Sequence, residues 1–118
     1  MNKIEWYTKD NQVAILYSPG FGAGWSTWGD RRLAYDKRVV EKWFEIQEKL
    51  AAGERFSEMM DEMEEFIDSL PEYNAPYMGG LDKVQVEWVN KGDFFYIYDY
   101  DGHETLVVES DLMIAGGE

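Results

Sequence analysis

The sequence contains no cysteine, so a disulfide framework, a thiolate zinc site and a cysteine nucleophile are excluded. It has only three prolines, a single histidine, and eleven basic residues against twenty-four acidic ones. No apolar run approaches the length of about 18 residues that a membrane helix needs, and the first ten residues lack the apolar stretch of a signal peptide. Binding of duplex nucleic acid by the whole surface is not expected, because it requires clustered Lys and Arg. These absences predict a cytoplasmic protein with no membrane segment.

The residues that are present predict one globular domain over 1–118, because 45% are hydrophobic and 16% aromatic. The net charge of −13 has two interpretations. It can serve solubility alone, or it can imitate DNA phosphates and occupy a basic groove on a nucleic-acid enzyme. Eight of the acids are concentrated in residues 54–72, whereas six of the eleven bases fall in residues 31–49.

The hydrophobic patterning predicts an α+β domain with the element order ββααβββ, a mostly antiparallel sheet and two helices packed on one of its faces. The expected strands are 3–7, 13–17, 84–88, 94–100 and 104–108, and the expected helices are 36–52 and 57–70. Gly53 is the expected C-terminal cap of the first helix, and Ser57 the expected N-cap of the second. Two turns are expected to form hairpins, at 90–93 and at Asp101-Gly102.

The segment "GFGAGWSTWGD" between the second strand and the first helix is the most unusual part of the sequence. Its glycines allow the backbone to approach a ligand closely, its hydroxyls and the arginines that follow match phosphate geometry, and its tryptophans can stack on a planar group. The predicted ligand-binding residues are Gly22, Gly24, Trp25, Ser26, Trp28, Arg31 and Arg32, closed by Tyr77, Tyr100 and Asp101. Neither a P-loop nor a dinucleotide fingerprint fits the segment. The alternative is a glycine-rich turn whose tryptophans plug the end of the core.

Strand 94–100 places Phe94, Tyr96, Tyr98 and Tyr100 on one face. That face can be a ligand wall, a subunit interface, or a surface covered by a loop. The carboxyl groups around His103 (Asp99, Asp101 and Glu104) raise the possibility of a metal or acid–base site, but their places beside a two-residue turn favour a backbone role. No cofactor, metal or catalytic residue is therefore predicted.

The sequence resembles a group of small, uncharacterised phage and prophage proteins of Gram-positive hosts. The matching positions are the GFGAGWSTW motif at 20–28, Tyr77 with Gly79 and Gly80, and the YDGxE motif at 100–104. The resemblance covers most of the chain apart from the acidic second helix. It implies an accessory protein in the host cell that acts by binding more than by catalysis.

The combined expectation is a binding protein that sequesters a nucleotide-like small molecule, such as a host defence signal. An acidic protein–protein inhibitor of the DNA-mimic type, directed at a basic host protein, is the alternative, and a nucleotide hydrolase is a third. The exposed aromatic residues further predict a homo-oligomer.

Overall fold

The computed structural model describes residues 3–20 and 24–109. Its element order is ββααβββ, with short 3-10 turns before α1 and before β3, and this confirms the predicted α+β class. The strands are β1 (Thr8–Lys9), β2 (Gln12–Tyr17), β3 (Gln85–Asn90), β4 (Phe95–Tyr100) and β5 (His103–Val108). The helices are α1 (Lys37–Ala51) and α2 (Phe56–Asp68), and the 3-10 turns are η1 (Arg31–Ala34) and η2 (Leu81–Lys83).

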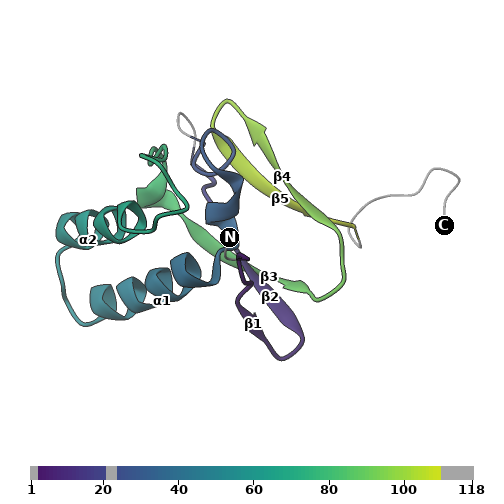
Figure 1. Cartoon of the computed structure of the whole chain (residues 1–118), viewed down its shortest axis with the longest axis horizontal. Helices are drawn as coiled ribbons and strands as arrows, with labels where there is room; N and C mark the ends of the chain where they lie inside the picture. Colours follow the sequence, from purple (N-terminus) through teal and green to yellow (C-terminus); the bar gives the residue numbers. More distant parts are fainter. Residues whose placement is uncertain (1–2, 21–23, 110–118) are drawn as a thin grey trace, which may run out of the picture.

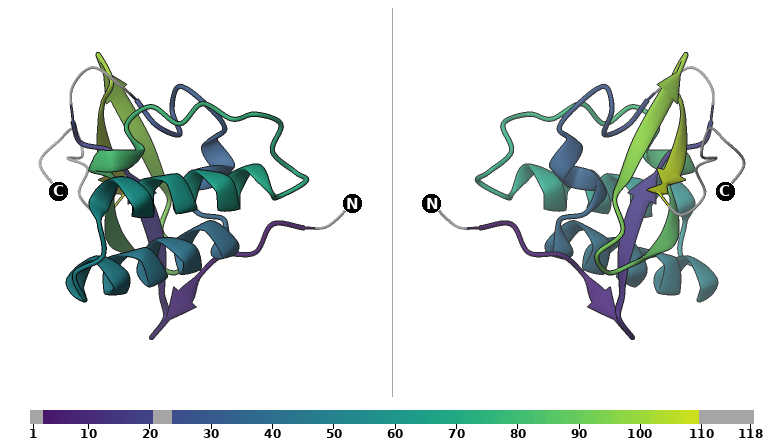
Figure 2. Two further views of the ribbon diagram at one scale, coloured as in Figure 1. Left: turned by 90° about the vertical axis from the view of Figure 1, so that its left-hand side faces the viewer. Right: turned by 90° about the vertical axis from the view of Figure 1, so that its right-hand side faces the viewer.

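The strands form two antiparallel sheets, β1-β2-β3 and the hairpin β4-β5, where the sequence suggested one. The two helices lie together to one side of the larger sheet, and the hairpin lies away from them (Figures 1 and 2). β2 is central because its side chains alternate between two cores. Ala14 and Leu16 pack with the helices, whereas Ile15 packs with the hairpin residues Phe95 and Ile97. The fold therefore has three layers, with helices, sheet and hairpin in that order.

The turn at 90–93 forms, but it joins strands of different sheets and does not make the predicted hairpin. Asn90 accepts the turn bond from the amide of Asp93, and Gly92 has φ 97°, which glycine adopts readily. The chain then crosses to the open face of the larger sheet. The inward side chains of β4 consequently cover that face instead of extending its edge.

The predicted first strand is also different, because residues 3–7 pair with the start of α1. The amide of Lys37 donates to the carbonyl of Glu5 at 2.8 Å, and Trp6 forms an isolated bridge with Asp36. The Trp6 ring stacks on Tyr35 with centroids 4.0 Å apart. Regular strand pairing with β2 is limited to Thr8–Lys9.

The helix boundaries follow their capping residues at α1 but not at the start of α2. The carboxyl group of Asp36 caps α1 by accepting from the amide of Arg38, and Gly53 follows the helix with φ 101°. The prediction of Ser57 as N-cap is wrong: α2 begins at Phe56, and Arg55 in the cap position makes no side-chain cap bond. The apolar stripe of α2 nevertheless determined where the helix packs, since Met59, Met63 and Ile67 are buried.

Candidate functional site

The glycine–tryptophan loop is attached to the C-terminal hairpin through Glu104, a carboxyl group with no exposed surface. One carboxyl oxygen accepts from the amide of Ser18 at 2.7 Å. The other accepts from the amide and the hydroxyl of Thr27, at 2.9 and 2.8 Å. The amide of Glu104 in turn donates to the carbonyl of Ser18 at 2.9 Å. Glu104 therefore joins the end of β2, the loop and β5 in one contact.

A second carboxyl group of the hairpin, that of Asp99, orients Trp28. The indole Nε1 of Trp28 donates to one oxygen of Asp99 at 2.9 Å, and the amide of Gly102 donates to the other at 2.8 Å. The first bond fixes one edge of the indole, and the second belongs to the Asp101-Gly102 turn, whose two residues have φ 52° and 86°. The predicted two-residue hairpin is thus confirmed, and it supports the orientation of Trp28.

Glycines make room for the rings of Trp28 and Tyr77, whose centroids are 5.9 Å apart at an angle of 48°. A Cβ at Gly24 would lie 2.7 Å from the Trp28 ring, and one at Gly79 would overlap the Tyr77 hydroxyl. A Cβ at Gly29 would lie 3.0 Å from the Cβ of Tyr77. These contacts give the loop glycines a structural purpose: they allow two large rings to pack closely at the surface. Trp28 remains 45% exposed and Tyr77 38% exposed.

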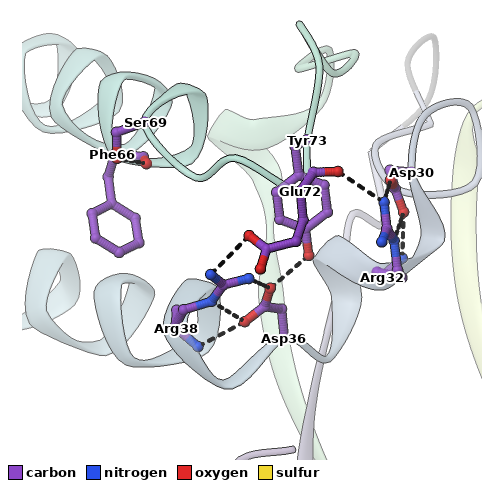
Figure 3. A network of polar contacts seen from close by, with 8 residues as sticks. All are labelled: Asp30, Arg32, Asp36, Arg38, Phe66, Ser69, Glu72 and Tyr73. Atoms are coloured by element: carbon purple, nitrogen blue, oxygen red, sulfur yellow. Dashed lines mark hydrogen bonds and ion pairs between the residues drawn. The ribbon is translucent and has the colours of Figure 1, made fainter. Parts of the chain in front are cut away.

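The segment that carries Tyr77 follows α2 and is held by a polar network centred on Asp36 (Figure 3). The buried Asp36 accepts from the Tyr73 hydroxyl at 2.6 Å and from the Arg38 guanidinium at 2.7 Å. Arg38 also binds the carboxyl group of Glu72 at 3.0 Å. Arg32 donates to the backbone carbonyl of Glu72 at 3.1 Å. Two arginines and one aspartate thus fix residues 72–73 against η1 and α1.

The ionisation of this network favours the charged carboxylates. Burial by itself would raise the pKa of Asp36, but hydrogen bonds from Arg38 and Tyr73 outweigh it and leave that pKa below its usual value. Burial, together with the bond to Asp36, raises the pKa of the Tyr73 hydroxyl. The hydrogen bond from Arg38 lowers the pKa of Glu72. The network consequently holds a negative charge on Asp36 at neutral pH.

Between the loop and the segment after α2 lies an open hollow of about 590 Å³. Its lining residues are Trp28, Gly29, Asp30, Arg31, Asn74, Pro76 and Tyr77. Three of them, Trp28, Arg31 and Tyr77, were predicted as ligand-binding residues. Arg31 is exposed and forms no ion pair with any residue in the described ranges. The hollow thus combines two exposed aromatic rings with one guanidinium that no described carboxylate engages.

Other predicted residues lie elsewhere. Trp25 and Ser26 are fully buried, and neither the indole Nε1 of Trp25 nor the hydroxyl of Ser26 has a hydrogen-bond partner within the described part of the chain. Trp25 belongs to the helix-side core, as the core-plug alternative expected for that residue. Arg32 is engaged by both carboxyl oxygens of Asp30, at 3.0 and 2.6 Å. Gly22 lies outside the described residues.

The hairpin residues Tyr100 and Asp101 are exposed at the tip and do not line the hollow. Across residues 3–20 and 24–109, no group of three or more His, Asp or Glu side chains is placed to hold a metal ion. A second hollow of about 550 Å³ lies beside the N-terminal segment and the turn after β3, where Ile4, Trp6 and Phe95 form part of its wall. It contains none of the predicted ligand-binding residues.

The acidic face of α2 points mostly to solvent. Glu62 is bound by Lys42 and by Lys49 of α1, both at 2.8 Å. The hydrogen bonds from these two lysines lower the pKa of Glu62 to about 2. The exposed acids of α2, which we define as Glu58, Asp61, Glu65 and Asp68, form no ion pair with other described residues.

Two residues that hold the loop, Asp99 of β4 and Glu104 of β5, were not assigned this role from the sequence. The sequence suggested Asp99 and Glu104 as possible metal or turn residues, and Glu104 also as part of the YDGxE motif. Asp99 shares a strand face with Phe95 and Ile97, and Glu104 pairs with it across the hairpin, so both are carboxyl groups on an inward face. A carboxyl group on an inward face requires hydrogen-bond donors from elsewhere in the chain. This requirement could have indicated from the sequence that Asp99 and Glu104 bind another segment.

Comparison with known proteins gives no relative: no family model, no curated protein and no solved structure matches this chain. Over the described residues, neither helix has the length and apolar character required to cross a bilayer. The proposed function therefore rests on the geometry of the hollow and of the residues that hold its lining in place.

Proposed function

We propose that the chain binds a planar, anionic small molecule of nucleotide type in the hollow between Trp28, Arg31 and Tyr77. The observation that carries the proposal is the pair of exposed aromatic rings held in fixed positions. Trp28 is bound by Asp99 and backed by Gly24, and Tyr77 fits against Gly79. Burying large rings is favourable, so support of this kind for rings that stay exposed indicates a contact surface.

The chemistry of the lining residues matches the two parts of a nucleotide. A base can stack on the Trp28 indole or the Tyr77 ring, a contact worth about 1–3 kcal/mol per base. Arg31 can form two parallel hydrogen bonds with a phosphate, and no described carboxylate competes for it. Arg32 has a different task, because its guanidinium is already bound by Asp30. One arginine thus contacts the ligand and its neighbour supports the wall.

We propose further that the protein binds its ligand without converting it chemically, as a phage-type accessory protein that sequesters a host signal molecule. Among the described residues, the lining of the hollow includes no serine, histidine or lysine, and the carboxyl group that it does include, that of Asp30, is occupied by Arg32. The phage setting is itself part of the proposal, and it follows the resemblance suggested by the GFGAGWSTW and YDGxE motifs of the sequence. Sequestration requires affinity and abundance alone, which suits a small domain with an open site.

The test is calorimetry and thermal denaturation of the full chain with ATP, cyclic mononucleotides and cyclic dinucleotides as probes. A probe at about 100 times its dissociation constant should add roughly 2.7 kcal/mol to the stability. Arg31→Ala and Trp28→Ala should each weaken binding by roughly tenfold or more. Arg55→Ala is the matched control, because Arg55 is exposed at the start of α2 and makes no side-chain cap bond.

Failure of every probe to bind would refute the nucleotide class. Full affinity in the Arg31→Ala variant would instead remove the phosphate role of Arg31. Equal losses in Arg31→Ala and Arg55→Ala would indicate general charge attraction and no defined site.

The acidic inhibitor of the DNA-mimic type has less support. The exposed acids of α2 are free to meet a basic protein, but a solvated helix face has the same appearance. None of these acids lines the hollow between Trp28, Arg31 and Tyr77.

A further inference from the structure

The hairpin β4-β5 has one buried face and one face in water. Its inward side chains, among them Phe95, Ile97, Leu106 and Val108, complete the second core. The outward face carries Tyr96, Tyr98 and Tyr100, with Phe94 just before the strand. The exposed fractions in sequence order from Phe94 are 76%, 52%, 52% and 65%. We call these four residues the aromatic face.

Across the hairpin, the aromatic face continues onto β5. Tyr96 pairs with Val107, Tyr98 with Thr105 and Tyr100 with His103. None of the residues on this face is an acid or a lysine, although the chain carries a net charge of −13. The fold thus leaves one sheet face both apolar and nearly free of charge.

We propose that the aromatic face is the contact surface of a homodimer, in which the outward faces of two β4-β5 hairpins pack together across a twofold axis. A twofold contact needs one patch that is complementary to itself, and tyrosines provide ring surface together with a hydroxyl that donates and accepts. Two copies that are each strongly acidic repel one another over most of their surface. An uncharged face is where a second copy of this chain can approach.

The exposed area is sufficient for such a contact. An aromatic side chain buries about 150–250 Å² when it is fully covered, so the aromatic face leaves roughly 500 Å² in water. Two copies would then bury about 1,000 Å² from these rings alone, which reaches the lower bound of a specific interface. Thr105 and Val107 extend the area at its centre.

This dimer would also bear on the ligand site, because β4 carries Asp99 between Tyr98 and Tyr100. Asp99 holds the Trp28 indole from the inward face of the same strand. A second hairpin packed over the outward face would therefore lie directly against the strand that orients Trp28. The dimer does not depend on the proposed ligand, since the aromatic face and the hollow share no residue.

The test is sedimentation of the full chain over a range from nanomolar to high micromolar concentration. The wild type should reach twice the monomer mass of 13.8 kDa. Tyr98→Lys should sediment as a monomer with an unchanged circular dichroism spectrum, because it places two like charges at the centre of the contact. Phe56→Lys is the control and should remain dimeric, since Phe56 is equally exposed, at 50%, on the first turn of α2.

Salt gives an independent measurement on the wild type. Because the contact has few charges and the two copies repel at long range, the dimer should become tighter as salt is added. A wild-type mass of 13.8 kDa at every concentration would overturn the proposal. Dimerisation that survives Tyr98→Lys, or that weakens with salt, would overturn it as well. If Tyr98→Lys fails to fold, Tyr96→Ser combined with Tyr100→Ser serves as the second variant. This variant should be a monomer, and a dimer would overturn the proposal.

Discussion

Replacement of Glu104 by glutamine changes one atom of a side chain that has no exposed surface, and its cost can be worked out from the donors around it. The two carboxyl oxygens accept three hydrogen bonds, one from Ser18 and two from Thr27. Glutamine keeps one acceptor oxygen and gains an amide group that only donates. If the amide faces Thr27, two donors lose their acceptor. If it faces Ser18, only one does, so the second arrangement is favoured.

Even in that arrangement, the amide of Ser18 stays buried and faces another donor. An unsatisfied buried donor costs about 1–3 kcal/mol, and donor–donor repulsion adds to this, so we expect Glu104→Gln to destabilise the domain by roughly 2–4 kcal/mol. For a domain of this size, that corresponds to a fall in melting temperature of about 10 °C. Urea denaturation followed by tryptophan fluorescence measures the change, with Glu109→Gln as the control because Glu109 is exposed just after β5.

Adding Thr27→Val to Glu104→Gln distinguishes the loop contact from a general core effect. The two substitutions should cost less together than the sum of their separate effects, because they remove partners of one interaction. A destabilisation by Glu104→Gln below about 0.5 kcal/mol, or simple additivity with Thr27→Val, would refute the view that this carboxyl group anchors the loop.

Three further predictions concern the Asp36 network that holds the segment after α2, the glycine beside Tyr77, and the acidic face of α2. The pKa of Asp36 is lowered on folding, so its stabilisation is present above the unfolded value of about 4 and is lost as pH falls through the lower folded value. Tyr73→Phe should therefore cost roughly 1.5–3 kcal/mol near pH 7 and distinctly less in acid, and urea titrations that give equal costs at both would contradict this. Gly79→Ala should displace the Tyr77 ring and weaken nucleotide binding by calorimetry while the melting temperature changes little; unchanged affinity would show that the ring position does not matter. Reversing three of the exposed acids of α2 should leave the proposed nucleotide binding intact and leave stability equal or slightly higher. If the charge-reversed protein instead lost the proposed counter-defence activity in phage-infected cells, the DNA-mimic class would be favoured.

The features that could be predicted from the sequence are those determined by residues close together in the chain. The start of α1 followed from the change of hydrophobic period near residue 36 and its end from Gly53, and the Asp101-Gly102 turn followed from the need for two residues with positive φ. The division into two sheets could not be predicted in this way. A turn such as 90–93 reverses the chain whether β4 extends the first sheet or forms a second one. The burial of β2 on both of its faces decides in favour of two sheets.

The same distinction applies to the candidate site. The residue types of Trp28, Arg31 and Tyr77 suggested a ligand, and the three do line one hollow. Trp25 has the same residue type as Trp28 but points into the core, which depends on the path of the loop and not on composition. The role of Arg32 was likewise decided by a neighbour, because Asp30 is two residues away and engages its guanidinium.

The attachment of the loop to Glu104 has a consequence for the order of folding. Thr27 and its acceptor are separated by 77 positions in the chain, so during synthesis the loop emerges long before the strand that completes it. Until β5 is in place, the amides of Ser18 and Thr27 lack the acceptor they use in the native state. Contacts between such distant residues form late and slow the folding of small domains. Trp28, which depends on β4 for its Asp99 acceptor, should accordingly be among the last side chains to reach its native position.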